Sequence, residues 1–183
     1  MKRLATFILS TFLAFTLTAA KADSPNSLTG IDAEIWSGLK NTNWIQQGKG
    51  ERVIYAFIDT NCTYCRALFK KAQTELQSEH AQIRWIPVQA LTETAQSSRN
   101  GAAKAIEGGY AALAMAMKGN TPPGRPSSQE FDRIDENDRF LSRNVEKYVQ
   151  SGVPKVIYIK DGGKEVRVFT GLPPAHELNK IFR

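Results

Sequence analysis

Cys62 and Cys65 are the only cysteines in the 183-residue chain, and two residues separate them. A C-x-x-C pair at the start of a helix can carry out thiol–disulfide exchange. Cys62 would stand at the first turn, where free backbone N–H groups and the helix dipole stabilise a thiolate. Cys65 would lie one turn further on, facing the sheet, within reach to attack a mixed disulfide and release the partner. The spacing also lets the two sulfur atoms form a disulfide without rearrangement of the backbone.

Two other uses of the pair stay open from the residues alone. One is a purely structural disulfide, although a bridge that closes so short a loop removes little chain entropy. The other is half of a zinc site, which needs two more ligands, and the sequence has neither a second C-x-x-C nor an H-x-H motif. Because His80 and His176 are also far apart, we expect no metal centre and no cofactor beyond the redox-active cysteine pair.

The segments around the pair predict the elements that position it. Residues 53–58 (VIYAFI) form a continuous apolar run, which predicts a strand buried on both faces. From Cys62 to Leu76, apolar residues recur at three- and four-residue steps, which predicts a helix with one apolar stripe, and Asn61 is expected to cap it. Residues 83–88 (IRWIPV) predict the next strand, so the three elements form a βαβ unit.

The rest of the chain shows further helical and strand patterns. Helical spacing recurs in four segments, at residues 31–39, 93–117, 129–150 and 174–182. The second of these is expected to break at Gly108-Gly109, and a turn is expected at 47–50. Strands over 156–159 and 166–170 should form a hairpin through the turn at 161–163.

The N-terminus has the pattern of a cleaved signal peptide. A basic start at 1–3 precedes an apolar stretch at 4–17 that is too short to span a bilayer comfortably. The residues at 20–22 (AKA) supply an A-x-A cleavage site. We therefore expect residues 1–22 to be removed, the mature chain to begin at Asp23, and the protein to be periplasmic. A retained membrane anchor is the alternative.

Composition and charge exclude several classes of protein. Hydrophobic residues make up 42% and charged residues 23%, which excludes wholesale disorder, collagen-like repeats and a polytopic membrane protein. The net charge of +6 falls to +3 once residues 1–22 are removed. Arg66, Lys70 and Lys71 are expected on the solvated face of their helix, and no basic run carries interleaved aromatic residues. We therefore expect no nucleic-acid partner.

The combined features resemble the thioredoxin fold, and more closely the catalytic domain of the periplasmic disulfide isomerase and reductase family of DsbC and DsbG. The resemblance begins near Trp36 and rests on four motifs, which are F-x-D at 57–59, N-C-x-Y-C at 61–65, G-x-P at 152–154 and G-L-P at 171–173. It implies an α/β, thioredoxin-like fold, with a central mixed β-sheet flanked by helices and an inserted helical subdomain at about 91–149. The chain would then consist of a signal peptide at 1–22, a leader and helix at 23–45, and the thioredoxin-like domain at 46–183.

The same resemblance implies roles for residues around the cysteines. Cys62 and Cys65 would be catalytic and would form the redox-active disulfide. The Val153–Pro154 peptide bond would be cis and would face the pair, with the backbone of Val153 holding an incoming peptide in a strand-like pose. Thr63 and Tyr64 would contact substrate from the helix side.

The sequence departs from the family pattern at several points. The family's N-terminal dimerisation domain is expected to be absent, so we expect a monomer. Val153 stands where those relatives have threonine and the oxidase DsbA has valine, and Thr63 replaces the usual glycine or proline. Thioredoxin and DsbA place a buried carboxylate six residues before the first cysteine, where this chain has Ala56. Asp59 is nearer to the pair but is interpreted as a cap at the strand end, which leaves water or a backbone-bound group as the proton acceptor for Cys65.

We therefore expect an exported thiol–disulfide oxidoreductase that acts on other exported proteins with cysteine pairs. Cys62 would be the nucleophile and Cys65 the resolving thiol. A reductase or isomerase would draw electrons from a DsbD-like membrane donor, whereas an oxidase would be recharged by a DsbB-like membrane acceptor. The alternative is a non-enzymatic chaperone or assembly factor, in which the thioredoxin scaffold binds an unfolded segment and the disulfide is structural.

Overall fold

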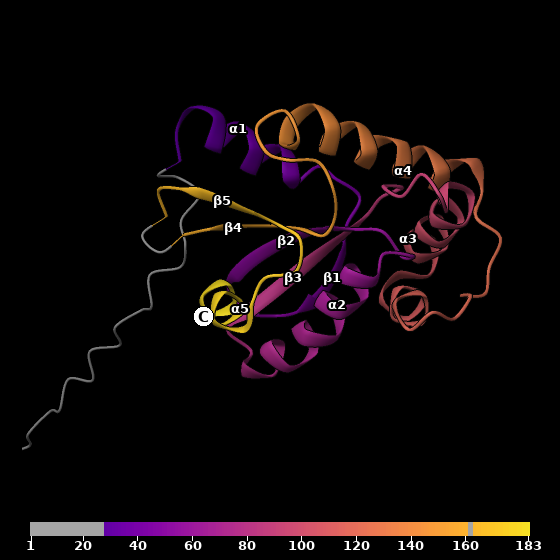
Figure 1. Cartoon of the computed structure of the whole chain (residues 1–183), viewed down its shortest axis with the longest axis horizontal. Helices are drawn as coiled ribbons and strands as arrows, with labels where there is room; N and C mark the ends of the chain where they lie inside the picture. The colour runs from indigo at the N-terminus through magenta and orange to yellow at the C-terminus, as the bar shows by residue number, and fades with distance from the viewer. Residues whose placement is uncertain (1–27, 161–162) are drawn as a thin grey trace, which may run out of the picture.

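A mixed β-sheet forms the centre of the computed structural model, which describes residues 28–160 and 163–183. In this part of the chain, five strands lie in the order β1-β3-β2-β4-β5 (Figure 1). The strands are β1 (Ile45–Gly48), β2 (Arg52–Ile58), β3 (Ala81–Pro87), β4 (Lys155–Ile159) and β5 (Val166–Thr170). Only β2 and β3 pair in parallel, and the other neighbours are antiparallel. The mixed sheet and the βαβ unit predicted from the sequence are confirmed.

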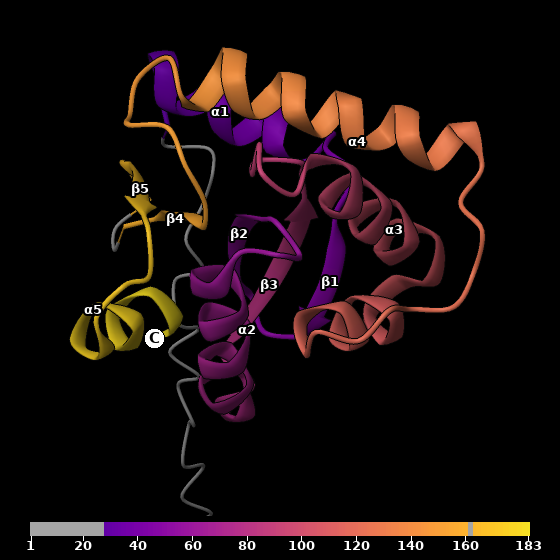
Figure 2. The same ribbon diagram turned by 45° about the vertical axis from the view of Figure 1, so that its right-hand side comes forward.

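Helices cover both faces of this sheet. Those in the described residues are α1 (Gly30–Leu39), α2 (Thr63–Glu75), α3 (Ala95–Met117), α4 (Ser128–Phe140) and α5 (Ala175–Phe182). A 3-10 turn at Leu76–Ser78 ends α2, and a π-helical turn at Leu141–Val145 continues α4. The helices α2 and α5 pack on one face of the sheet, while α1 and the π-helical turn pack on the other (Figure 1, Figure 2).

The side chains of β2 alternate between two hydrophobic cores. Ile54, Ala56 and Ile58 pack in the core under α2 and α5. Tyr55 and Phe57 pack in the core under α1, where the ring of Tyr55 meets Trp36 edge-on at 5.2 Å between centroids. Both faces of the strand are therefore buried, which is the reason for its uninterrupted apolar sequence.

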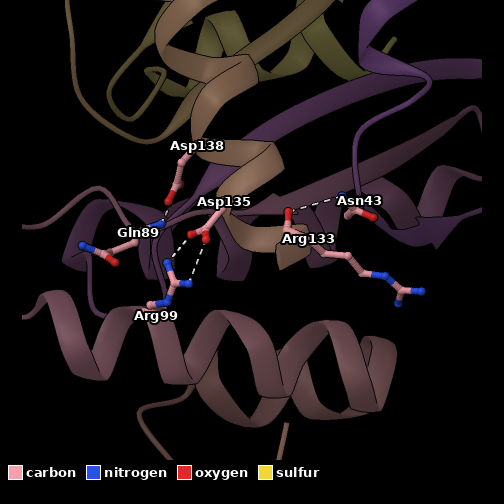
Figure 3. A network of polar contacts seen from close by, with 6 residues as sticks. All are labelled: Asn43, Gln89, Arg99, Arg133, Asp135 and Asp138. Carbon is pink, nitrogen blue, oxygen red and sulfur yellow. Dashed lines mark hydrogen bonds and ion pairs between the residues drawn. The ribbon is translucent and has the colours of Figure 1, made fainter. Parts of the chain in front are cut away.

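The helices α3 and α4 come between β3 and β4 in the chain and form the inserted helical subdomain (Figure 2). Figure 3 shows the polar contacts that hold α4 in place. Arg99 of α3 forms a two-pronged ion pair with Asp135 of α4. The backbone N–H of Gln89, just after β3, donates to the Asp138 carboxylate at 3.0 Å. These contacts tie α4 both to α3 and to the end of a central strand.

A buried asparagine adds a second link between the subdomain and the sheet. The Asn137 amide accepts from the backbone N–H of Asn43 at 2.8 Å and donates to the carbonyl of Pro87 at 2.9 Å. The Asn43 side chain in turn donates to the carbonyl of Arg133 at 3.2 Å (Figure 3). The segment before β1 is thereby joined to α4.

The structure corrects one expectation about the elements and confirms another. The sequence predicts a turn at 47–50, but residues 45–48 form β1, an edge strand paired with β3. Only Ile45 of this strand is buried, so its apolar pattern is too short to recognise. The predicted break in α3 is confirmed at Gly109, where φ is 62° and ψ is −149°, a conformation that favours glycine.

Residues 1–27 and 161–162 lie outside the described residues. The expected signal peptide at 1–22, the start of the expected leader and the first two residues of the turn at 161–163 fall there. None of the helices in the described residues has the length and apolar character that crossing a bilayer requires.

Candidate active site

Cys62 stands at the N-terminus of α2, directly after the connection from β2. It is the N-cap of the helix, and its Sγ accepts a hydrogen bond from the backbone N–H of Cys65 at 3.4 Å. The expectation that Asn61 caps the helix is therefore wrong by one residue. A sulfur at the cap position receives the N–H groups that the first turn leaves unpaired.

These contacts make Cys62 the more acidic thiol of the pair. Hydrogen bonds from the Cys65 thiol, which has the largest effect, and from the backbone N–H groups of Cys65 and Tyr64 together lower the pKa of Cys62 to about 6, against the opposing effect of burial. The side chain is largely buried, with 6% of the residue exposed. At neutral pH, Cys62 is therefore mostly a thiolate, which is the form that attacks disulfides.

Cys65 has the opposite character. It is fully buried in the core under α2. Burial raises the pKa of Cys65, and the neighbouring Cys62 raises it further. Both cysteines are free thiols in this structure, so the expected Cys62–Cys65 disulfide is not formed in it. The pair combines one nucleophilic thiolate with one thiol that keeps its proton.

The loop that precedes β4 faces Cys62. The Val153–Pro154 peptide bond is cis, as the sequence resemblance implied. The Cys62 Sγ lies 3.7 Å from the carbonyl oxygen of Val153, so this loop and the helix N-terminus meet at the sulfur. Pro154 is buried and Val153 is half-buried. Thr63 and Tyr64 lie beside the pair on the first turn of α2, and Tyr64 is 63% exposed.

A buried lysine, which the sequence did not indicate, anchors the residues on either side of the Val153 loop. The Lys155 side chain is fully buried, and its ammonium donates to the carbonyl of Gln150 and, at 3.3 Å, to the hydroxyl of Thr170. Its nearest carboxylate is Glu146 at 3.7 Å, and Glu146 also accepts from the backbone N–H of Gly152 at 2.9 Å. Burial lowers the pKa of Lys155.

Asp59 does more than the strand-end cap that the sequence suggested. Its carboxylate is fully buried and accepts four hydrogen bonds, from the N–H groups of Asn61, Ala90 and Leu91 and from the hydroxyl of Ser98, at 2.8–3.1 Å. Its carbonyl also accepts from the N–H of Cys62 at 3.1 Å. The end of β2, the loop after β3 and the start of α3 therefore meet at one carboxylate next to the cysteines. The sequence signal for this role is the position of Asp59, a charged residue between an apolar strand and a C-x-x-C pair.

The expectation that Arg66 lies on the solvated face of its helix is wrong. Lys70 and Lys71 are exposed as expected, but Arg66 is half-buried, and its Nε donates to the carbonyl of Thr60 at 2.8 Å. It therefore supports the connection that leads to Cys62. Among the described residues, no group of three His, Cys, Asp or Glu side chains is arranged to hold a metal ion.

Comparisons with known proteins show a family and two curated proteins that are similar to this chain in sequence. The sequence profile of the thioredoxin-like domain family matches residues 42–183. The thiol:disulfide interchange protein DsbG of Escherichia coli is 23% identical over 156 residues, covering 81% of this chain and 60% of that protein. DsbG of Pseudomonas aeruginosa is 30% identical over 66 residues, or 35% of this chain and 26% of that protein. The chain thus spans about 60% of the length of the Escherichia coli relative.

Solved structures share the fold. A periplasmic thioredoxin-like protein from Salmonella enterica serovar Typhimurium superposes with a TM-score of 0.62 at 17% identity, covering 84% of this chain and 97% of that one. The catalytic domain of Proteus mirabilis ScsC gives a TM-score of 0.60 at 16% identity, covering 83% and 94%. These likenesses confirm the thioredoxin-like architecture expected from the sequence.

Proposed function

The chain belongs to the thioredoxin-like domain family, and on that premise we propose that it is a thiol–disulfide oxidoreductase acting on cysteine-containing proteins. The observation that carries the proposal is the opposed pair of shifts, a pKa of Cys62 lowered to about 6 beside a pKa of Cys65 raised by burial. A structural disulfide needs no such difference, whereas exchange needs one reactive and one reserve thiol.

Starting from the reduced pair, the exchange reduces a substrate disulfide, and the same steps in reverse oxidise a substrate dithiol. The Cys62 thiolate attacks one sulfur of a substrate disulfide, so that a Cys62–substrate bond forms and the substrate bond breaks. The displaced sulfur leaves as a thiolate and takes a proton from water. Cys65 then gives its proton to water and attacks the Cys62 sulfur, which releases the second substrate sulfur as a thiolate. Two electrons pass from the protein to the substrate, and the Cys62–Cys65 disulfide forms.

The surroundings of the pair support further parts of the proposal. Thr63, Tyr64, Val153 and Pro154 are the proposed substrate contacts, because the first two flank Cys62 on the helix and the loop meets its sulfur. The backbone of Val153 is available to an extended peptide at that point. We propose that the protein is periplasmic, supported by the signal-peptide pattern and by the similar periplasmic protein from Salmonella, and that it acts as a monomer.

The direction of exchange depends on how strongly the reduced form is stabilised. A thiolate stabilised at Cys62 favours the reduced pair, which makes the couple more oxidising. This favours an oxidase recharged by a DsbB-like membrane acceptor, or an isomerase supplied by a DsbD-like donor, over a strong reductase, and Val153 in the place of threonine supports the oxidase.

The reduction potential of the Cys62–Cys65 couple, measured by equilibration with glutathione, tests the proposal. A value of about −120 to −180 mV would support an oxidase or isomerase, and about −220 to −270 mV would indicate a reductase. A value below about −300 mV would indicate an inert bridge and support a chaperone or assembly factor instead. In parallel, Cys62→Ser should abolish exchange, and Cys65→Ser should trap mixed disulfides.

A further inference from the structure

A cavity of about 290 Å³ lies on the side of the β2–α2 connection that faces the helical subdomain. Its walls come from residues 60–61 and Arg66, from the first half of α3, and from the segment that follows α3. The cavity is therefore built where the subdomain meets the element that carries Cys62.

The charged side chains that line this cavity are positive. Among the residues that the structure describes, Arg66 and Lys104 are the charged ones in its lining, and no carboxylate lines it. The other polar groups are neutral amides and hydroxyls, from Asn61, Ser97, Asn100, Asn120 and Thr121. Two half-buried cations among neutral donors favour an anion, and a carboxylate or phosphate suits such donors.

Hydrogen bonds hold both cations in place while leaving donors free. Lys104 gives one hydrogen bond, to the carbonyl of Pro122 at 2.9 Å, and an ammonium has three N–H donors. Arg66 uses Nε on Thr60 and Nη2 on the Asn61 side chain at 3.4 Å. Its Nη1 lies 3.6 Å from the point where a Cβ on Gly119 would stand, so the absence of a side chain at Gly119 leaves room beside it.

The wall of the cavity includes the residue next to the nucleophile in the chain. Asn61 immediately precedes Cys62, and its amide donates to the hydroxyl of Ser97 at 2.9 Å on the opposite wall. Cys62 is thus flanked by a residue of the cavity wall, Asn61, and its sulfur contacts the Val153 loop.

We propose that this cavity binds a carboxylate of the disulfide partner that Cys62 attacks, so that the protein prefers acidic disulfide substrates. The inference rests on the proposed thiol–disulfide exchange and adds a substrate class to it. The carboxylate can belong to a small acidic thiol compound or to an acidic side chain close to the cysteine of a client protein.

Exchange with disulfides that differ in charge tests the preference. The reduced protein is mixed with glutathione disulfide, which is anionic, with hydroxyethyl disulfide, which is neutral, and with cystamine, which is cationic. Lys104→Met should lower the rate with glutathione disulfide relative to hydroxyethyl disulfide by about fivefold, because one charged hydrogen-bonding partner is lost. The preference should also weaken in high salt. Lys118→Met is the matched control, since Lys118 is exposed at the end of α3 and does not line this cavity.

A binding measurement separates this inference from the proposed function. S-methylglutathione carries carboxylates but no free thiol, so calorimetric titration of the wild-type protein detects binding without exchange. Binding that Lys104→Met weakens and Lys118→Met leaves unchanged supports the cavity, even if no disulfide is exchanged and the proposed function fails. Exchange that proceeds equally with all three disulfides, together with no S-methylglutathione binding, overturns the cavity proposal and leaves the proposed function standing.

Two disulfide-linked model peptides distinguish the sources of the carboxylate. The peptides differ only in glutamate or glutamine beside the cysteine. A glutamate preference that disappears in Lys104→Met assigns the cavity to acidic client segments. A preference for glutathione disulfide without a peptide difference assigns it to a small acidic thiol compound. Lys104→Met and Lys118→Met acting alike on every substrate would refute both assignments.

Discussion

The hydrogen bond that the Cys65 thiol gives to Cys62 is the largest cause of the lowered pKa of Cys62. Cys65→Ala removes this donor, so we expect the pKa of Cys62 to rise above about 6. Cys65→Ser keeps a hydroxyl donor and should raise the pKa less. Titration of the thiolate ultraviolet absorbance measures both. If the two variants gave the same pKa as the wild type, the backbone N–H groups of the first turn would be sufficient to hold the thiolate.

Asp59 makes a second prediction at the residue scale. Its buried carboxylate accepts four hydrogen bonds. In an asparagine, an NH2 group would replace one of the two acceptor oxygens and would face donors that have lost their acceptor. Asp59→Asn should therefore cost about 2–4 kcal/mol in the free energy of unfolding, measured with urea. Because the Asp59 charge raises the pKa of Cys62, the variant should also have a more acidic Cys62. Asp132→Asn, on the exposed side of α4, is the control. A stable variant with an unchanged thiol pKa would contradict both expectations.

Some residues of the site could be predicted from the sequence and others could not. Cys62 and Cys65 could be identified from their spacing, and Pro154 from its family motif. Arg66, Asp59 and Lys155 look like ordinary charged residues in sequence. Their buried partners come mainly from other segments, such as Ala90 for Asp59, 31 positions away, and Thr170 for Lys155, 15 positions away.

At the scale of elements, a titratable side chain joins α4 to the loop that follows β3. Burial raises the pKa of Asp138 to about 6, against the hydrogen bond from Gln89. The folded protein therefore keeps a proton that the unfolded chain loses near pH 4, so the free energy of unfolding should fall as pH rises from about 4 to about 6. Asp135 and Asp59 raise this pKa as well, whereas Arg99 lowers it.

Asp138→Asn should remove this loss of stability while keeping an acceptor for the Gln89 N–H. We expect the variant to be more stable than the wild type by about 1–2 kcal/mol at neutral pH, after a discount for partial exposure, and about equal near pH 4. Urea unfolding at several pH values, with Asp132→Asn beside it, measures the difference. A gain of equal size at every pH would point to a cause other than the titration of Asp138.

The elements themselves followed from the sequence wherever their patterns were long. The apolar run of β2, the stripe of α2 and the glycine break in α3 each depend on nearby residues, so local physics predicted them. The edge strand β1 did not follow, because it is four residues long and its identity depends on pairing Ile45 with Trp85 of β3. The π-helical turn after α4 likewise has no sequence sign that we recognise.

At the scale of the whole molecule, the site is assembled from three separate segments. The β2–α2 connection carries the cysteines, the loop after β3 and the start of α3 hold Asp59, and the chain from the end of the helical subdomain into β4 presents Val153. The subdomain is therefore part of the scaffold of the site, because its last turn supplies Glu146 to the buried Lys155.

Lys155 tests whether this long-range support matters for substrates. Lys155→Met leaves the carbonyl of Gln150 without this partner and Glu146 without its cation, so we expect a loss of about 2–4 kcal/mol in the free energy of unfolding. A looser Val153 loop should lower kcat/KM for a peptide disulfide, which lies along the loop, several-fold more than for hydroxyethyl disulfide, which needs only Cys62. Lys160→Met, an exposed lysine just after the same strand, should change neither. Equal losses with both substrates would show that Lys155 supports the fold without positioning the loop.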